Sequence, residues 1–566
     1  MMRLLLLPGR VTLTQRSTRW PSGVATFASL PSQDWRQVVA DFRRKAGNDE
    51  AELVSEDAAN AVFVCAANNR IREALDIIYK AEMRGVQTPL KSHVQVCCAM
   101  ARKNQKDRAL EAMKTLHERF GAEFQQTSAL HWGVYDPLLS VFKAQGDWRS
   151  THTAIGQMNE LGITPSLRSF RVLMLTAAKA RRKDSLLSTV AFVKEKFPEV
   201  WTDVRTLTAI CQAFVQIGEP ERAMKIYQKI DAEWLQQNGN TVLYNQLLLA
   251  AIRSSDAAPK PTKNGNRRNV QKHIPMGIQA ATRIFGQLQA AQNASADDFT
   301  FATYMLGLEK RDRWDQVVEL FNTMLDTQTR NKKSSKSEPQ KPLINALACS
   351  TMIRALHKLS ETHEFKQSDP ESQKEGLKAP RKSSKKLSPQ QEKFKKDVVV
   401  VLKQLFTVDL TSIGHASTLI DTLDEFKLFT PARKIFQRML DEDVIKETPW
   451  RQKDGFEIDL HTFSRGVAKC AVVSAFEEIR ASQSGTSEAS LPGNAPLENL
   501  RVITGVGNRS QEFLKPVLKQ EISELLSKSC RPPLWPSTHP TNPGVLVVTR
   551  NRLRNWIEKG GVIRYF

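Results

Sequence analysis

The chain has 566 residues, of which 41% are hydrophobic and 25% are charged, and it carries a formal net charge of +22. Its length exceeds what one hydrophobic core supports, and no apolar run approaches the roughly 18 residues of a transmembrane helix, so we expect several domains or a repeat array without a membrane span. A balance this basic favours a polyanionic partner, most simply nucleic acid.

The first 33 residues lack acidic side chains and contain four arginines together with several Ser and Thr. This composition predicts an organelle transit peptide over residues 1–33, which takes no part in the fold. We expect the mitochondrion as the destination, with the plastid as the alternative. Residues 34–54 are interpreted as an N-terminal extension.

The seven cysteines are scattered along the chain, and no two of them have CxxC spacing. This pattern excludes a conventional zinc ribbon and a disulfide framework, as expected in a reducing compartment. We expect the cysteines to be buried residues of helices.

Residues 55–448 repeat a pattern of two amphipathic helices joined by a turn. A small residue lies on the buried face of a helix in several units, at Ala74, Ala109, Ala223 and Ala432, among apolar residues at helical spacing. Two helices in each unit of about 35 residues indicate a helical solenoid. The units start near residues 55, 90, 132, 167, 204, 241, 298, 346 and 413.

Three units are lengthened by low-complexity tracts near residues 254–273, 329–342 and 362–396. The tracts are rich in Lys, Ser, Pro and Asn and poor in large apolar residues, so we expect disordered insertions. Their basic clusters either add a salt-dependent attraction to phosphates or are solvated linkers.

Segments 134–166 and 204–230 resemble pentatricopeptide repeats, and the ending Gly162–Pro165 is typical of that family. The alternative is a peptide-binding array of the tetratricopeptide type, which the period and the endings GITPS and RGVQTP make less favoured. The resemblance implies that single-stranded RNA binds along the repeats, with one base for each repeat.

In that family, the fifth residue of a repeat and its last residue read the base. The resemblance therefore implies three reading pairs, Asp136 with Ser166, Thr208 with Asn240, and Asn245 with Asp297. The alternative is that polar residues near a helix start are caps. In other repeats the fifth position holds Ala59, Val94, Arg171 and Ala302, so we do not expect continuous reading of a sequence.

The last hundred or so residues have a different pattern, with two strand-like segments that each lead into a helix. The first segment ends in IDLH, and alternation along a strand puts Asp459 and His461 on the same side. The second ends in TGVG, from Thr504 to Gly507, before a helix expected near Ser510. Glycines and a helix N-terminus suit a phosphate, and ligands of open α/β sheets commonly bind beyond the carboxyl ends of the strands.

These motifs, together with the closing segment PTNPGVLVVTRNRLRNWIEKGGVIRYF, make residues 456–566 resemble an Smr (small MutS-related) domain. The resemblance implies phosphodiester cleavage, with His461 as general acid or base and Asp459 orienting it, acting as the base or holding a divalent ion such as Mg²⁺. It also implies that phosphate or RNA is bound in this domain by the residues Thr504, Gly505, Gly507 and Arg509.

Two residues depart from the Smr pattern. Thr462 replaces a glycine, and Arg509 stands where many relatives have a second histidine. An arginine still binds phosphate, so the departures affect binding less than acid–base chemistry. The alternative is that Asp459 and His461 only fix the end of their strand, and the sequence leaves open whether this protein is an enzyme.

The expected fold is an α-solenoid of helix-turn-helix repeats over 55–448, followed by a small α/β domain of the Smr type. The expected function is organellar RNA binding by the repeats and endonucleolytic cleavage by the C-terminal domain. The alternatives are a non-catalytic factor in transcript stabilisation, translation or ribosome assembly, and a protein scaffold without RNA. The expected partners are single-stranded RNA and an organellar ribonucleoprotein, and we expect no small-molecule substrate.

Overall fold

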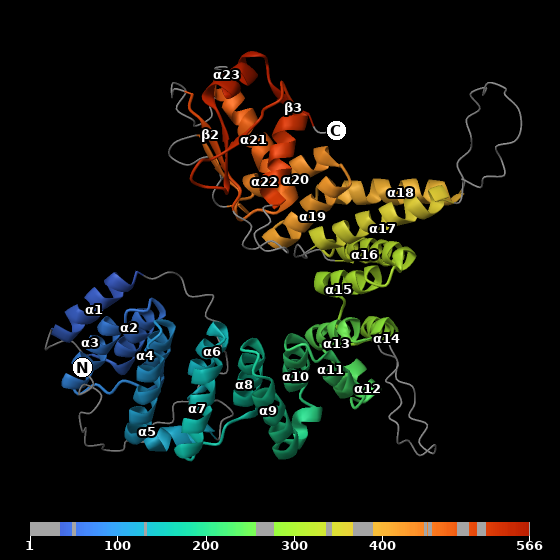
Figure 1. The fold of residues 1–566 in the computed structure, drawn as a ribbon. Helices are drawn as coiled ribbons and strands as arrows, with labels where there is room; N and C mark the ends of the chain where they lie inside the picture. Colours follow the sequence, from blue (N-terminus) through green and yellow to red (C-terminus); the bar gives the residue numbers. More distant parts are fainter. Residues whose placement is uncertain are drawn as a thin grey trace, which may run out of the picture. The chain divides into compact units, whose positions relative to one another are not determined.

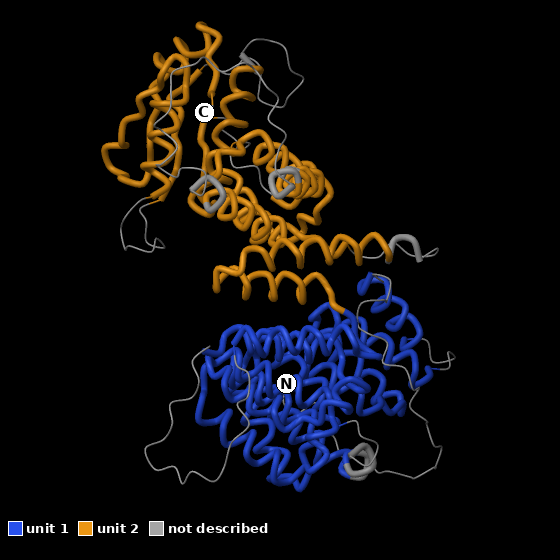
Figure 2. The backbone as a smooth tube through the Cα atoms, turned by 90° about the vertical axis from the view of Figure 1, so that its right-hand side faces the viewer, with its two compact units in different colours: residues 1–295 blue, residues 296–566 orange. Residues whose placement is uncertain are grey.

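The computed structural model describes residues 34–47, 53–128, 133–255, 277–334, 342–365, 389–445, 450, 456–483, 497–505 and 517–564. The chain divides into two compact units, Met1–Ser295 and Ala296–Phe566, which Figure 2 colours separately. None of the helices in the described ranges combines the length and the apolar character needed to cross a bilayer. The segment 1–33, predicted to be a transit peptide, lies outside the described residues.

Unit 1 is a row of helical hairpins preceded by α1 (Trp35–Gly47), which packs on the first hairpin (Figure 1). The hairpins are α2 (Ser55–Ala67) with α3 (Ile71–Met83), α4 (Leu90–Arg102) with α5 (Lys106–Ser128), α6 (Asp136–Gln145) with α7 (Trp148–Glu160), α8 (Leu167–Lys179) with α9 (Lys183–Lys196), α10 (Val204–Gln216) with α11 (Pro220–Tyr227), and α13 (Thr241–Arg253) with α14 (Gly277–Gln289). Two short helices, η2 (Pro198–Trp201) and α12 (Ala232–Asn238), lie between hairpins and were not predicted.

The turns of the first five hairpins of unit 1 have the same local structure, and the turn between α13 and α14 lies outside the described residues. One residue just after the first helix adopts the left-handed conformation, as Asn69 and Gly146 do, and the next residue donates its N–H back into the helix, as in the 2.9 Å bond from Asp147 to the Phe142 carbonyl. This is a Schellman-type end, which satisfies helix carbonyls and reverses the chain. The turn residue follows each unit start at a fixed distance: Asn69, Asn104, Gly146, Arg181 and Gly218 for the units starting near 55, 90, 132, 167 and 204.

Five of the six first helices in unit 1 begin at the predicted unit starts. The exception is α6, which begins at Asp136 rather than near 132 because a turn over residues 134–135 and Pro137 set its start. Successive first helices, from α2 through α4, α6, α8 and α10 to α13, pack against one another and form a continuous layer. That layer is what places equivalent residues of neighbouring units side by side.

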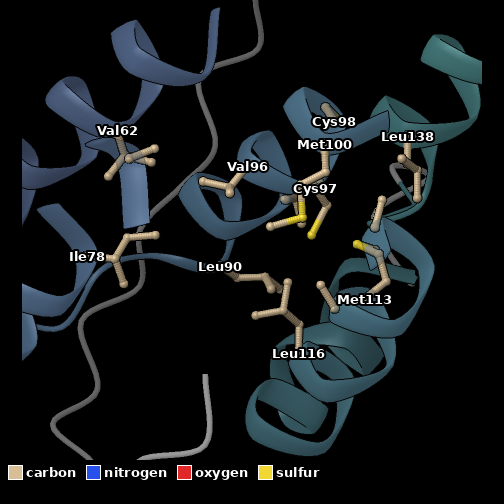
Figure 3. Close-up of a cluster of buried hydrophobic side chains, with 14 of the residues drawn as sticks. Val62, Ile78, Leu90, Val96, Cys97, Cys98, Met100, Met113, Leu116 and Leu138 are labelled. Carbon is tan, nitrogen blue, oxygen red and sulfur yellow. The ribbon is translucent and has the colours of Figure 1, made fainter. Parts of the chain in front are cut away.

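The core of unit 1 lies between the two helices of each hairpin and between neighbouring hairpins. Figure 3 shows Cys97 and Met100 of α4 near Met113 and Leu116 of α5. Burying one such aliphatic side chain stabilises the fold by about 1.5–3 kcal/mol. The small residues predicted to face the neighbouring helix are fully buried, namely Ala74, Ala109 and Ala223.

Unit 2 continues the hairpins and ends in the C-terminal module, which we define as residues 456–564. Its hairpins are α15 (Asp298–Glu309) with α16 (Trp314–Ser334), α17 (Ala346–Phe365) with α18 (Pro389–Gln404), and α19 (Ile413–Glu425) with α20 (Phe429–Asp441). Asp312 and Lys427 are the left-handed turn residues of the first and last of these hairpins. All three first helices begin at the predicted unit starts, and Ala432 of α20 is buried as expected.

The prediction that the low-complexity tracts are loops throughout is wrong at their edges. Residues 329–334, 362–365 and 389–396 belong to helices α16, α17 and α18. Gln, Glu, Lys and Arg are good helix formers, and the helix that continues from residue 389 buries Val401 and Leu405, so packing further along extends helix into the polar tract. The central parts of all three tracts lie outside the described residues.

The C-terminal module is built on a four-stranded sheet in the order β1-β2-β5-β4. Strands β1 and β2 are parallel and joined through α21, whereas β5 runs antiparallel to both β2 and β4. A separate antiparallel pair joins β3 and β6. The elements are β1 (Glu457–Asp459), α21 (Arg465–Gln483), β2 (Leu500–Ile503), α22 (Val517–Glu524), η4 (Leu525–Ser529), β3 (Cys530–Arg531), β4 (Ser537–Thr538), β5 (Val545–Val548), α23 (Arg550–Glu558) and β6 (Val562–Ile563).

The core of the module includes its largest aromatic side chain. Trp556 of α23 is buried and meets Phe476 of α21 edge to face, with ring centroids 5.4 Å apart. This residue is therefore part of the core, as expected for an apolar position on an otherwise charged helix.

All seven cysteines are buried and none forms a disulfide. Six lie in helices as predicted, but Cys530 lies in strand β3, because its short apolar segment pairs with the closing strand β6. Burial raises the pKa of Cys65 to about 11 and of Cys470 to about 12, so these thiols stay protonated and unreactive at neutral pH.

Candidate nucleic-acid interface

The carboxyl ends of β1 and β2 bring the module's two motifs to one edge of the sheet. Asp459 pairs in register with Ile503, and the Leu460 N–H donates to the Ile503 carbonyl at 2.8 Å. Thr504 and Gly505 follow directly. Parallel pairing therefore places IDLH beside the start of TGVG, as expected for strands joined through a helix.

Asp459 and His461 are in direct contact at this edge. His461 Nδ1 lies 2.5 Å from Asp459 Oδ1, which also accepts the His461 backbone N–H at 3.1 Å. The side chain of His461 is 55% exposed and that of Asp459 is 30% exposed. A carboxylate that accepts from Nδ1 orients the ring and leaves Nε2 to exchange a proton with a ligand. The sequence-based expectation that both lie on one side is met, while their catalytic role stays a prediction.

The glycine loop closes tightly against the turn before β5. The Gly544 carbonyl accepts from the Thr504 hydroxyl at 3.0 Å and from the Thr504 N–H at 2.8 Å. Gly505 has φ +76°, and a Cβ on Gly544 would lie 2.9 Å from the Gly505 carbonyl carbon. Both positions thus need glycine. Gly544 was not among the residues predicted for this site, and Gly507 and Arg509 lie outside the described residues.

Helix α19 of the last hairpin holds the start of α21. Asp421 accepts from the Gly466 N–H at 2.7 Å and from the Ser464 hydroxyl at 2.9 Å, which is the role of a helix cap supplied by another helix. Nearby, Asp424 accepts from Lys469 at 3.0 Å. Burial raises the pKa of Asp421. These bonds fix the segment that follows His461, and they could not be predicted from a local pattern because they join residues 43 and 45 positions apart.

The last residues of the predicted reading pairs are helix N-caps. Ser166 accepts from the Ser169 N–H at 3.4 Å, and Asn240 accepts from the Leu243 N–H at 2.8 Å. Asp297 accepts from the Thr300 N–H at 2.8 Å and forms a capping box with that residue. The cap interpretation is therefore confirmed for all three, and any reading of a base uses the oxygen or nitrogen that remains.

The fifth residues of the three predicted reading pairs are buried or half-buried, which limits their contact with a base. Asp136 is 4% exposed, lies 3.5 Å from Arg168, and has a pKa raised by burial. Asn245 is 5% exposed. Thr208 is half-buried and donates to the Val204 carbonyl at 2.7 Å, which leaves its oxygen lone pairs.

In the repeat spanning residues 167–203, the fifth and the last residue are in direct contact. Arg171, its fifth residue, donates to the carboxylate of Asp203, its last residue, at 2.8 Å, and Asp203 also caps α10. Thr208 and Asn240 hold the same two positions in the next unit. Sequence reasoning treated Arg171 as a departure from the pattern and missed its partner, although an arginine and an aspartate at these positions were visible.

The three predicted pairs thus fare differently. Asp136 lies 3.5 Å from Arg168 in the first turn of α8, and Ser166, its predicted partner, is the N-cap of the same helix. Thr208 and Asn240 lie on α10 and at the start of α13, which pack together. Asn245 lies in unit 1 and Asp297 in unit 2, the two compact units of the chain.

Residues 92–230 match a family model described as a pentatricopeptide repeat-containing protein. No curated protein sequence matches the chain. Among solved structures, the pentatricopeptide repeat protein PPR10 from maize is similar with a TM-score of 0.35 and 15% identity, over 87% of this chain and 59% of that one. PPR10 in complex with an 18-nt psaJ RNA element has a TM-score of 0.30 and 15% identity, over 80% and 55%. The chain thus matches less than two thirds of the length of either structure.

The hairpins and the family match together confirm the predicted helical repeats, and the small α/β fold that follows them is confirmed by the sheet. The Smr resemblance of residues 456–566 rests on its sequence motifs and stays a prediction.

Proposed function

We propose that this chain is an RNA-binding protein of the pentatricopeptide type that holds single-stranded RNA along its first helices and cleaves it with the C-terminal module. The observation that carries RNA binding is the junction between the first helices α8 and α10, where the fifth and last residues of one repeat, Arg171 and Asp203, meet at 2.8 Å. In the next repeat, Thr208 and Asn240 hold the same two positions and keep hydrogen-bonding groups that suit the edge of an unstacked base. The net charge of +22 supplies attraction to phosphates.

Cleavage is supported by the contact between Asp459 and His461. With Nδ1 bonded to the carboxylate, His461 Nε2 takes the proton of the hydroxyl that attacks the phosphorus, and Asp459 stabilises the resulting imidazolium. The bond from phosphorus to the leaving oxygen breaks, and that oxygen takes a proton from water. Gly505 lies beside this pair, since a Cβ on Gly505 would be 3.7 Å from the His461 Cβ, and a glycine lets a phosphate approach the backbone closely. Asp459 Oδ2 is a suitable single carboxylate ligand for Mg²⁺, which keeps most of its waters and supplies charge neutralisation when bound.

A non-catalytic RNA-binding factor, acting in transcript stabilisation, translation or assembly of an organellar ribonucleoprotein, is the second candidate. It is favoured by the two bonds that Asp459 Oδ1 accepts from His461, since closing the turn after β1 explains both residues without chemistry. For either function we propose the mitochondrion as the site of action, with the plastid as the alternative, from the composition of residues 1–33.

Incubating the purified full-length protein with labelled organellar RNA, with Mg²⁺ or with EDTA, separates the two candidates. The wild type is compared with Asp459→Asn, with His461→Gln and with the double variant, scoring binding and cleavage together. We expect the wild type to cleave the RNA at discrete positions. In each variant the cleavage rate should be at least a hundredfold lower while binding is retained. Equal binding without cleavage by any protein assigns the non-catalytic role, and absence of binding by all contradicts both candidates.

A further inference from the structure

The strand ends on the far side of the sheet from Asp459 and His461 form a second edge, where three segments meet. Strand β5 runs antiparallel to β2, so its end at Val548 pairs with the beginning of β2 at Leu500. Helix α23 therefore starts at that far edge, and the Arg550 N–H bonds the Asn499 side chain there at 2.8 Å. Strand β4 also begins at the far edge, because Ser537 pairs with Val547.

An exposed aromatic side chain lies at this edge. Trp535 precedes β4 and is 61% exposed, the highest fraction of any large aromatic side chain in the described part of the chain. Its carbonyl accepts a hydrogen bond from the Arg552 guanidinium, which ties the segment to α23. A tryptophan held in this way on a fixed segment offers its ring to a stacking partner.

The neighbouring helix supplies unneutralised positive charge. Arg550, Arg552 and Arg554 are all exposed, and within the described residues none of them pairs with a carboxylate. Other arginines of the chain behave differently, for example Arg354, which pairs with Glu309. Arg550 and Arg554 lie four residues apart on one face of α23, where like charges repel each other, and a polyanion relieves that repulsion.

We propose that Trp535 and the arginines Arg550, Arg552 and Arg554 form a second binding site for single-stranded RNA, at the edge of the sheet opposite Asp459 and His461. A base stacks on the indole, and the guanidinium groups bond the flanking phosphates. Stacking accepts every base, so this site holds RNA without reading its sequence. The proposal rests on the proposed function, because it takes RNA to be the ligand.

The two edges are separated by the length of the strands between them. Each strand residue spans about 3.3 Å, so the four residues of β2 separate the edges by on the order of 13 Å. RNA that contacts both edges must run along the module rather than end at the Asp459–His461 pair. The site at Trp535 then anchors the strand on one side of the bond that is cleaved.

Binding of one RNA by the full-length wild type, Trp535→Ala, Trp535→Phe and Arg550→Gln/Arg554→Gln, at several salt concentrations, tests the proposal. Loss of stacking weakens binding by about tenfold in Trp535→Ala, and Trp535→Phe keeps most of the affinity. The arginine variant loses two phosphate contacts, so its slope of log affinity against log salt is smaller in magnitude by about 1.4. Lys528→Gln, which removes an exposed and paired charge of the same module, is the matched control and binds as the wild type does.

Failure of the wild type to bind RNA contradicts the proposed function, whereas binding by the wild type with unchanged affinity in all variants overturns the second site alone. Thermal unfolding of each variant checks the fold, and if Trp535→Ala unfolds early, the other two variants decide. Photocrosslinking with 4-thiouridine-containing RNA gives an independent readout. Crosslinks on the peptide containing Trp535 support the site, and their confinement to other peptides overturns it.

Discussion

Unit 1 and the C-terminal module use their histidines and polar side chains in opposite ways. In unit 1, His93 is buried with its Nε2 2.8 Å from the Thr88 hydroxyl, and Asn240 is occupied by a helix cap. In the module, Asp459 and His461 contact each other while remaining partly exposed. A polar residue of the repeats thus has a structural role before any role in binding, whereas the module keeps a titratable pair within reach of a ligand.

The largest expected effect in unit 1 concerns His93 and acid. Burial lowers the pKa of His93 from 6.5 to about 4, so below pH 6.5 the unfolded chain takes up the proton first. The free energy of unfolding therefore falls as the pH drops from 6.5 to 4, by about 3 kcal/mol, and this group contributes no pH dependence above that window. Denaturant unfolding at a series of pH values measures the effect.

The variant His93→Gln should lose this acid sensitivity, while His152→Gln, at an exposed histidine of α7, should keep it. An unchanged pH profile in His93→Gln would show that other groups cause the acid destabilisation.

The next effect concerns the contact that holds the module on α19. Asp421→Ala removes the acceptor of the Gly466 N–H and the Ser464 hydroxyl, so we expect a loss of about 2 kcal/mol from the free energy of unfolding of unit 2. Amide hydrogen exchange at the start of α21 should become faster, and RNA cleavage should fall with it. Asp441→Ala, at an exposed position on α20, is the control, and equal exchange in both variants would show that Asp421 does not hold the helix.

The smallest expected effect concerns the contribution of the Asn240 cap to stability. Asn240→Ala removes the cap of α13 and should cost about 1 kcal/mol, whereas Asn240→Asp keeps a capping oxygen and should cost little. Thermal unfolding of the two variants against the wild type checks this order. Equal losses in both would mean that the cap at Asn240 contributes nothing to stability.

The hairpins could be predicted because their signals are local. Apolar spacing fixes each helix, and residues that tolerate the left-handed conformation, such as Asn69 and Gly146, fix each turn. Strand alternation predicted that Asp459 and His461 lie on the same side, whereas their direct contact arises in the turn after β1. The contacts that matter most around these sites did not follow, because Arg171 with Asp203, Asp421 with Gly466 and Gly505 with Gly544 join different elements. The exposure of Trp535 likewise depends on tertiary packing, which no local pattern in the sequence reveals.

Selection of RNA from a random library tests the central claim that the repeats bind RNA through paired positions. The wild type is compared with Thr208→Asn/Asn240→Asp, a variant that keeps the cap of α13 but changes the hydrogen-bonding groups at one junction. We expect an enriched sequence for the wild type and a changed preference at a single nucleotide for the variant. Enrichment of the same sequence by both proteins, or of none by the wild type, would contradict it.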